Sequence, residues 1–176
     1  MTPTAVRSCV NRLRLQNYLG LICLAILLAH TTDLPAQEKP QCALPDCDQA
    51  KAFFQKFQAA VNADQREEAA KLVRYPLRSY RNGKATVVQN TTQFLSEYDA
   101  IFDAPARCAL KAASVDDVWG NWRGFTVGAG LIWWDRIIPD AAGNPSVSDL
   151  TKYPFGVFSV NHGPGVAKGC GDAKSQ

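Results

Sequence analysis

Residues 125–134, with the sequence FTVGAGLIWW, decide the fold class. The odd positions form one side of an extended segment: Phe125, Val127, Ala129, Leu131 and Trp133. The even positions form the other side: Thr126, Gly128, Gly130, Ile132 and Trp134. This period of two predicts one long β-strand. The two glycines on the even side indicate a bend, or a place where another group packs close to bare backbone.

More strands are expected on both sides of this segment. Residues 77–89 are typical of a hairpin, because Asn82-Gly83 favours the positive φ values of a two-residue turn. Alternation at residues 108–113 predicts another strand. Phe155–His162 is expected to be the last strand, after a polar loop at about 139–152.

Helices are expected before the long strand. The first follows a capping Asp46 or Asp48. It carries apolar residues at helical spacing: Ala50, Phe53, Phe54, Phe57 and Val61. The second is short, begins at a capping box formed by Asp64 and Glu67, and ends at Pro76.

A third helix begins at Asn90, which Gln93 helps to cap, and stops near Pro105. Its apolar positions are Phe94, Leu95, Tyr98, Ile101 and Phe102. Helices followed by strands predict an α+β domain in which the helices pack against one face of the sheet.

The first 36 residues are predicted to be a signal peptide. Three arginines precede an apolar run of twelve residues, Tyr18–Ala29, and the small residue Ala36 follows. Twelve residues span about 18 Å as a helix, too short for a hydrocarbon core of about 30 Å. Cleavage is expected after Ala36, with Ala29 as the alternative. The predicted location is secreted or periplasmic, without a stable membrane anchor.

The mature chain, residues 37–176, is expected to be one nearly neutral domain with a glycine-rich C-terminal tail. The whole chain has a formal charge of +3, of which the leader contributes +2 through Arg7, Arg12, Arg14 and Asp33. A domain with a net charge near +1 lacks the excess positive charge with which proteins bind nucleic acid. Nearly half of the residues are apolar (47%), which argues against disorder.

The leader removes two of the six cysteines. The four that remain are Cys42, Cys47, Cys108 and Cys170. An even number in an exported chain predicts two disulfides, and three connectivities are open. Cys42 with Cys47 and Cys108 with Cys170 is the preferred pairing. The spacing lacks the CxxC and histidine partners of a zinc site, so no metal and no cofactor are expected.

The order of these elements resembles the nuclear transport factor 2-like superfamily, especially its small exported bacterial members. The likeness covers most of residues 48–162. It lies in the Phe53–Phe57 segment, VRYPL at 73–77, Phe94–Phe102, DVWGNWRGF at 117–125 and GAGLIW at 128–133. The resemblance implies three N-terminal helices on a curved, mainly antiparallel sheet that encloses a cone-shaped cavity. It also implies a possible homodimer through the sheet.

Isomerases and dehydratases of this superfamily use a carboxylate or histidine, with tyrosine or acid donors, inside the cone. A carboxylate in an apolar pocket has a raised pKa and transfers protons near neutral pH. The candidates here are Asp99, Asp103, Asp135 and His162, with Tyr75, Tyr80 and Tyr98 as donors. His162 is the only histidine after cleavage, and the absence of a G-x-S-x-G segment argues against a Ser-His-Asp hydrolase.

Tryptophans are the other candidate site. Four of them fall within sixteen residues: Trp119, Trp122, Trp133 and Trp134. Because Trp133 and Trp134 are adjacent, they point to opposite sides of a strand, so at least one faces the other side of the sheet, a cavity mouth or a partner. With Tyr80 and Tyr98, these residues are the predicted binding set.

The expected function is that of an exported binding module that holds a small apolar molecule or another exported protein by its aromatic sheet and cavity. The first alternative is an isomerase or dehydratase that uses a cavity carboxylate. The second is an inhibitor or immunity-type protein that uses the outer surface.

Overall fold

The computed structural model describes residues 42, 44–163 and 170. The predicted signal peptide and most of the glycine-rich tail lie outside the described residues. The helices are α2 (Cys47–Asn62), α3 (Arg66–Lys71), α4 (Thr91–Ser96), α5 (Tyr98–Ile101), α6 (Ala104–Ala112) and α7 (Val147–Leu150). Two 3₁₀ turns are η1 (Val115–Asp117) and η2 (Asp140–Ala142). The strands are β1 (Val73–Arg81), β2 (Lys84–Val88), β3 (Trp119–Asn121), β4 (Gly124–Val127), β5 (Ile132–Arg136) and β6 (Phe155–His162).

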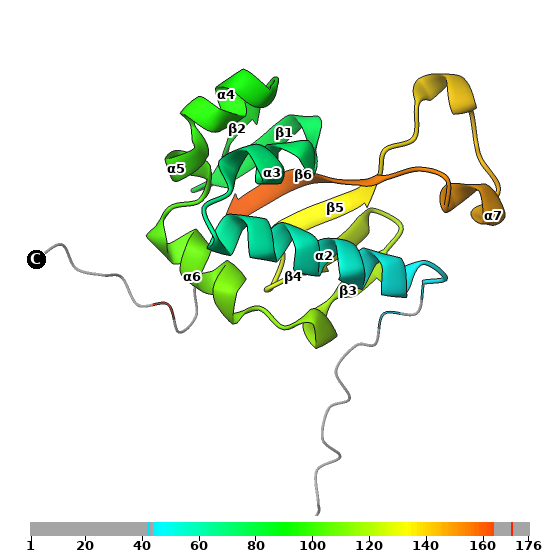
Figure 1. Ribbon diagram of the computed structural model, residues 1–176, viewed down its shortest axis with the longest axis horizontal. Coiled ribbons are helices and arrows are strands. Elements are labelled where there is room, and N and C mark those ends of the chain that lie inside the picture. The colour runs from blue at the N-terminus through cyan, green and yellow to red at the C-terminus, as the bar shows by residue number, and fades with distance from the viewer. Residues whose placement is uncertain (1–41, 43, 164–169, 171–176) are drawn as a thin grey trace, which may run out of the picture. The chain divides into compact units, whose positions relative to one another are not determined.

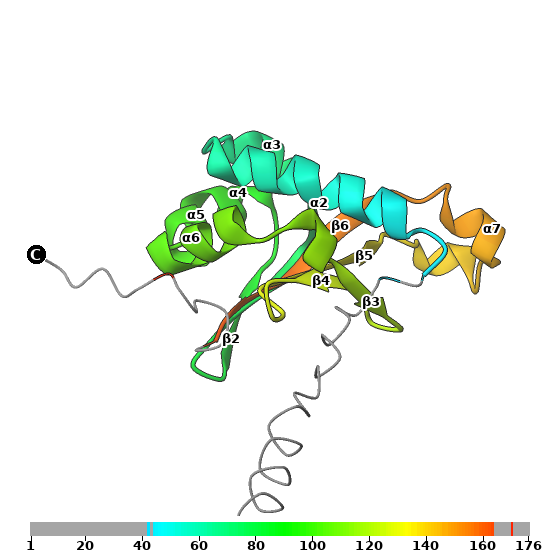
Figure 2. The same cartoon turned by 90° about the horizontal axis from the view of Figure 1, so that it is seen from below.

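The fold is α+β, with one curved sheet of six strands in the order β2-β1-β6-β5-β4-β3. All neighbouring strands are antiparallel except β1 and β6, which are parallel. Figure 1 shows α2 lying across the strands, and Figure 2 shows α2 to α6 gathered on one side of the sheet. The expectation of helices against one face is therefore confirmed.

The core lies between α2 and the sheet. Phe54 and Phe57 of α2 are fully buried, as the helical spacing of apolar residues predicts. Trp134 of β5 lies under this helix, with its ring centroid 5.7 Å from that of Phe54. A second aromatic group, formed by Phe94, Tyr98 and Phe102, extends the core toward α4 and α5.

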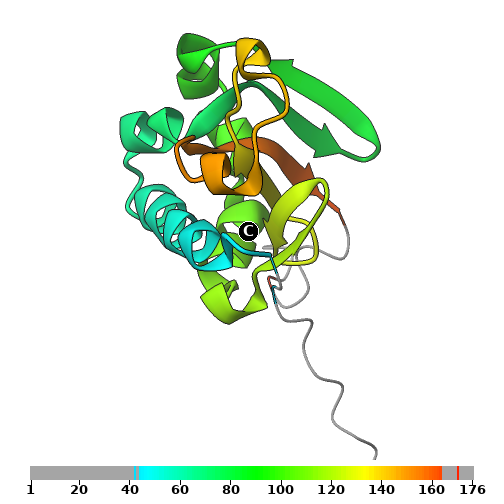
Figure 3. The same cartoon turned by 90° about the vertical axis from the view of Figure 1, so that its right-hand side faces the viewer.

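Several predicted elements are confirmed. The 77–89 hairpin forms around Asn82 and Gly83, which both have positive φ, and it extends away from α2 (Figure 3). The side chain of Asn90 accepts a hydrogen bond from the backbone N–H of Gln93 and so begins α4. The last strand covers Phe155–His162, as expected.

The long strand expected at 125–134 is wrong, because this segment is a hairpin. Gly128, Ala129 and Gly130 all have positive φ, and they reverse the chain between β4 and β5. Three successive residues in this conformation cannot continue a strand. The alternation on either side of the turn was real, but the turn changes which residues share a face.

The strand expected at 108–113 is also wrong, because these residues belong to α6. The Asp103 carboxylate accepts a hydrogen bond from the backbone N–H of Ala106, and Pro105 lies in the first turn. Proline is tolerated there because the first N–H groups of a helix have no intrahelical partner. The expected stop at Pro105 was therefore part of a helix start.

Two helix predictions need smaller corrections. The second helix ends at Lys71, and Pro76 lies inside β1, after a cis peptide bond with Tyr75. The third expected helix is divided at Glu97 into α4 and α5. Asp46 occupies the N-cap position of α2 without capping it, since its carboxylate pairs with Arg136 instead.

The cysteines form the preferred pairs. Cys42 lies with Cys47, and Cys108 lies with Cys170, with Cα atoms 6.0 and 5.8 Å apart respectively. Disulfides of this kind fit a protein outside the reducing cytoplasm. Among the residues that the structure describes, no helix has the length and apolar character that crossing a membrane requires.

Candidate binding face

One face of the sheet has no described helix over it, and we call it the open face. The strand register places one residue from each of five strands in a row across it. From β1 to β3 this row is Arg78, Ser159, Trp133, Thr126 and Trp119. Since paired residues point to the same side of a sheet, these five side chains share the open face.

Trp133 lies at the centre of the row and separates two hollows. The first, of about 260 Å³, is lined by Arg78, Tyr80, Arg123, Trp133, Phe158, Ser159 and Asn161. The second, of about 390 Å³, lies between Trp119 and the β4–β5 turn. The Trp119 and Trp133 rings meet edge to face, with centroids 6.3 Å apart. Trp133 therefore offers part of its surface to both hollows.

The first hollow has unpaired positive charge. Arg78 and Arg123 are exposed, and neither forms an ion pair with another described residue. The Arg123 guanidinium lies 4.7 Å from the ring centroid of Trp122. A guanidinium fork binds carboxylates in a planar, two-bond geometry, and arginine, tyrosine and tryptophan are the residues that contribute most to protein interfaces. The hollow is thus suited to carboxylate side chains.

The predicted tryptophan and tyrosine residues fall in three places: the open face, the core and, for Trp122, a separate pocket. Trp119, Trp133 and Tyr80 lie on the open face, where Tyr80 is 38% exposed. Trp134 and Tyr98 are fully buried, which is a correction to their predicted binding role. Trp134 packs between α2 and β4, whereas burial raises the pKa of the Tyr98 hydroxyl within the aromatic core.

Trp122 is the most exposed of the four tryptophans, at 84%. It projects from the β3–β4 turn beside a separate, mostly apolar pocket of about 380 Å³. We call this the α7 pocket; its main walls are Leu44, Trp122, Phe125, Ile138, Val147 and Leu150. No expectation from the sequence placed a pocket here, because α7 lies in a segment whose polar composition indicated a loop.

Two carboxylates line the α7 pocket, Asp46, which pairs with Arg136, and Asp135. Burial raises the pKa of Asp135, against the hydrogen bond that its Oδ1 accepts from the Arg136 backbone N–H at 2.8 Å. The neighbouring Arg136 is 5% exposed and occupied by Asp46, Gln49 and the Tyr153 carbonyl. The Arg74 and Arg136 charges lower the pKa of Asp135, but burial outweighs them, and the environment of Asp135 favours the protonated acid.

The other predicted acids have structural partners. The Asp99 carboxylate is exposed and pairs with Arg66 and Arg107 at 3.0 and 2.7 Å. Such surface pairs contribute little to stability and do not form a cavity. Asp103 and His162, by contrast, lie together on the helix-covered side of the sheet, 3.6 Å apart. Tyr75 lies at the edge of the aromatic core, where its hydroxyl donates to the Ala70 carbonyl.

Within residues 42, 44–163 and 170, no three His, Cys, Asp or Glu side chains come together as a metal site. No protein-family model, no curated protein and no solved structure matches this chain.

Proposed function

We propose that this chain is an exported binding module whose open face binds another exported protein through a segment that combines carboxylates with apolar side chains. The observation that carries the proposal is the row of Arg78, Trp133 and Trp119 on a sheet face without a helix over it. The predicted signal peptide and the two cysteine pairs support a location outside the cytoplasm. An inhibitor or immunity-type protein would use the same face.

The chemistry of the face favours this class of partner. Trp119 and Trp133 provide a rigid apolar surface, and Arg78 and Arg123 provide charges without partners among the described residues. Each arginine gains a hydrogen-bonded partner on binding a carboxylate, whereas a basic partner would meet repulsion. The cone-shaped cavity and the relationship to the nuclear transport factor 2-like superfamily remain part of this proposal.

A synthetic peptide of alternating glutamate and phenylalanine is expected to bind, and its lysine counterpart is not. Reversing the two charges with Arg78→Glu and Arg123→Glu is expected to weaken binding about tenfold or more, because attraction becomes repulsion. Trp133→Ala is expected to weaken binding about 30-fold, the effect of a hot-spot residue. Isothermal titration calorimetry at low and high salt measures the affinity of the unmodified chain and of each variant for the peptides.

The matched control reverses two exposed charges on the helix side, Lys56→Glu and Lys111→Glu, which changes the net charge equally. Binding within about twofold of the unmodified chain is expected. Equal loss in the two double variants would reduce the effect to net charge and contradict a site on the open face. Equal binding of the glutamate and lysine peptides would contradict the proposed chemistry.

A second candidate function is proton transfer in the α7 pocket, as in an isomerase or dehydratase. The observation that favours it is a carboxyl group of raised pKa, Asp135, in an apolar pocket large enough for a small molecule. Asp99 and Asp103 are poorer candidates for this chemistry, because both are held by arginine side chains.

Asp135→Asn is expected to stabilise the fold by up to about 1 kcal/mol at pH 7. The folded pKa is raised, so as pH rises the unfolded chain loses its proton first, and the carboxylate then destabilises the fold. The gain should shrink as pH falls toward 3, where the carboxyl of the unfolded chain also becomes protonated. Urea unfolding at pH 7 and pH 3 tests this.

Asp149→Asn is the matched control, because the Lys152 ammonium lowers the pKa of the Asp149 carboxyl. This variant is expected to lose stability at pH 7, and the loss should shrink at pH 3 as the carboxyl begins to gain its proton. A loss of stability in Asp135→Asn at pH 7 would show that Asp135 is not a destabilised carboxylate.

A further inference from the structure

Three polar side chains that are far apart in the sequence meet on the helix-covered side of the sheet. The Oγ of Ser79 lies 3.3 Å from Nε2 of His162, and Nδ1 of His162 lies 3.6 Å from Oδ1 of Asp103. We propose that Ser79, His162 and Asp103 form a nucleophilic triad for the hydrolysis of small esters. The site lies on the opposite side of the sheet from the open face and does not depend on it.

The parallel pairing of β1 and β6 brings Ser79 and His162 together. Ser79 pairs with Val160, and Arg81 pairs with His162. Serine and histidine therefore lie on adjacent strands, separated by one intervening residue pair, and point to the same side of the sheet. Ser79 is 8% exposed and the His162 side chain 7% exposed. Their contact is therefore fixed by the sheet rather than by a surface loop.

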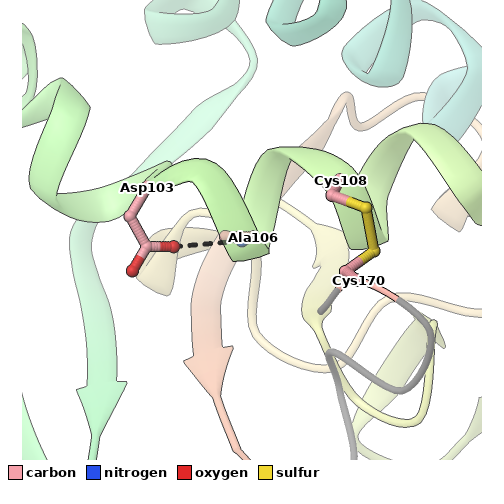
Figure 4. The surroundings of a disulfide bond; sticks show 4 residues. All are labelled: Asp103, Ala106, Cys108 and Cys170. Carbon is pink, nitrogen blue, oxygen red and sulfur yellow. Dashed lines mark hydrogen bonds between the residues drawn. A yellow bond between two sulfur atoms is a disulfide. The ribbon is translucent and has the colours of Figure 1, made fainter. Parts of the chain in front are cut away.

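Asp103 is held in place from two sides. Its Oδ1 accepts a hydrogen bond from the Ala106 backbone N–H at 3.0 Å, which begins α6 (Figure 4). Its Oδ2 accepts one from Arg81 at 2.7 Å. Burial opposes the ionised form, but these two donors outweigh it and lower the pKa of Asp103. A fixed carboxylate thus faces Nδ1 of the histidine.

This arrangement selects the useful form of His162. A carboxylate beside Nδ1 favours the tautomer with its proton on Nδ1, which leaves Nε2 free to accept the Ser79 proton. Burial and the nearby Arg81 charge lower the pKa of His162, and the Asp103 charge opposes them. The imidazole is therefore neutral at pH 7, as a general base must be. Asp103 acts as a positioning residue.

Ser79 opens onto a hollow of about 380 Å³ between the β1–β2 hairpin and α4–α5. Its walls combine the charged side chains of Arg81, Lys84 and Glu97 with apolar Ala100 and Ile101. Asp103 and the Ala100 carbonyl engage the Arg81 guanidinium, whereas Lys84 forms no ion pair with another described residue. Lys84 is therefore the cation of this wall that is left to stabilise negative charge on a carbonyl oxygen. It also favours esters whose acyl group carries a carboxylate.

The reaction balances with water alone. Ser79 Oγ attacks the ester carbonyl carbon, its proton passes to Nε2 of His162, and that proton then passes to the departing alkoxide as the carbon–oxygen bond breaks. Water, deprotonated by the same nitrogen, attacks the acyl carbon, the acyl–Oγ bond breaks, and the proton on Nε2 returns to Ser79 Oγ. The products are an alcohol, a carboxylic acid and free Ser79, and no atom is oxidised or reduced.

Diisopropyl fluorophosphate tests the nucleophile, because serine displaces fluoride from its phosphorus and keeps the phosphoryl group. Peptide mass spectrometry is expected to find the adduct on Ser79. Ser96→Ala is the control; it removes another serine on the helix-covered side, in α4, and should label at the original rate. No adduct on Ser79 of the folded chain after hours at millimolar reagent would overturn the proposal.

Two further variants test the roles of the partners. His162→Gln is expected to slow labelling about 100-fold. Asp103→Asn keeps a residue that caps helices and is expected to slow it about tenfold or more. In the unmodified chain the rate should fall as His162 gains a proton, at a pH lower than for an ordinary histidine because burial lowers its pKa. A rate that is unchanged in His162→Gln, or that shows no fall at acid pH while the chain stays folded, would overturn the mechanism.

The substrate class is tested with two chromogenic esters of similar size, the p-nitrophenyl monoester of succinate and p-nitrophenyl butyrate. The value of kcat/KM is expected to be about fivefold or more higher for the succinate ester, and Lys84→Gln should remove this preference. Equal hydrolysis of both esters by the unmodified chain would overturn the assignment of an anionic acyl group.

Discussion

Replacing Trp134 by alanine is expected to lower the free energy of unfolding by about 3–5 kcal/mol, the cost of removing a large aromatic side chain from a core. Trp134 is fully buried, and its ring lies 5.7 Å from Phe54 and 6.2 Å from Phe125, both nearly parallel to it. The cavity would lie between α2 and the sheet, where two layers of the fold meet. Urea unfolding at pH 7 with the disulfides intact measures the loss.

The adjacent tryptophan provides the control. Trp133 is partly exposed on the open face, so Trp133→Ala is expected to cost less than about 1.5 kcal/mol. Trp134→Phe should also cost less than about 1.5 kcal/mol. It keeps an aromatic ring, and the indole N–H that it removes has no hydrogen-bond partner among the described residues. Equal losses for Trp133→Ala and Trp134→Ala would contradict the assignment of the two faces.

The opposite orientation of these two tryptophans was predictable, because adjacent residues of any strand point to opposite sides. Which of the two lies in the core was not. That depends on the hairpin at Gly128-Ala129-Gly130, since the turn decides how β4 and β5 pair. Alternation is visible along one strand, whereas pairing between strands is a property of the folded chain.

Helix α6 shows that an alternating pattern can also predict the wrong type of secondary structure. Cys108, Leu110 and Ala112 alternate with Ala109, Lys111 and Ala113, but a short apolar pattern fits a strand or a helix. The decisive signal was local: Asp103 as a helix cap and Pro105 in the first turn. The interpretation of Pro105 as the end of one helix left the start of α6 unpredicted. For residues 103–112, the capping residues are therefore a better guide to the type of secondary structure than the alternation is.

The candidate sites differ in the same way. The open face contains three of the predicted aromatic residues. The clustering of aromatic residues in the sequence indicated a binding surface, although it did not show which of them would be exposed. The Ser79–His162 contact joins residues 83 positions apart through a parallel β1–β6 pairing, and the expectation of a mainly antiparallel sheet did not specify which strands would pair in parallel. The absence of G-x-S-x-G excluded one known arrangement of a serine nucleophile, not the geometry itself.

Removing the Cys108–Cys170 disulfide is expected to lower the free energy of unfolding by about 4 kcal/mol. The two cysteines are separated by 62 positions, and cross-linking them restricts the unfolded chain over that whole length. The bond joins α6, the helix that begins at Asp103, to the C-terminal segment (Figure 4). The double variant Cys108→Ser with Cys170→Ser, unfolded in urea without reductant, measures the effect.

The second disulfide is the control for this argument. Cys42 and Cys47 are separated by only five positions, so the same entropy relation gives about 2 kcal/mol for Cys42→Ser with Cys47→Ser. If the stabilisation comes from the unfolded chain, the longer loop must contribute about twice as much. Equal losses, or a larger loss for the short loop, would show instead that contacts of the cysteines in the folded state dominate. The open face contains neither pair, so peptide binding by the folded fraction should survive both double variants.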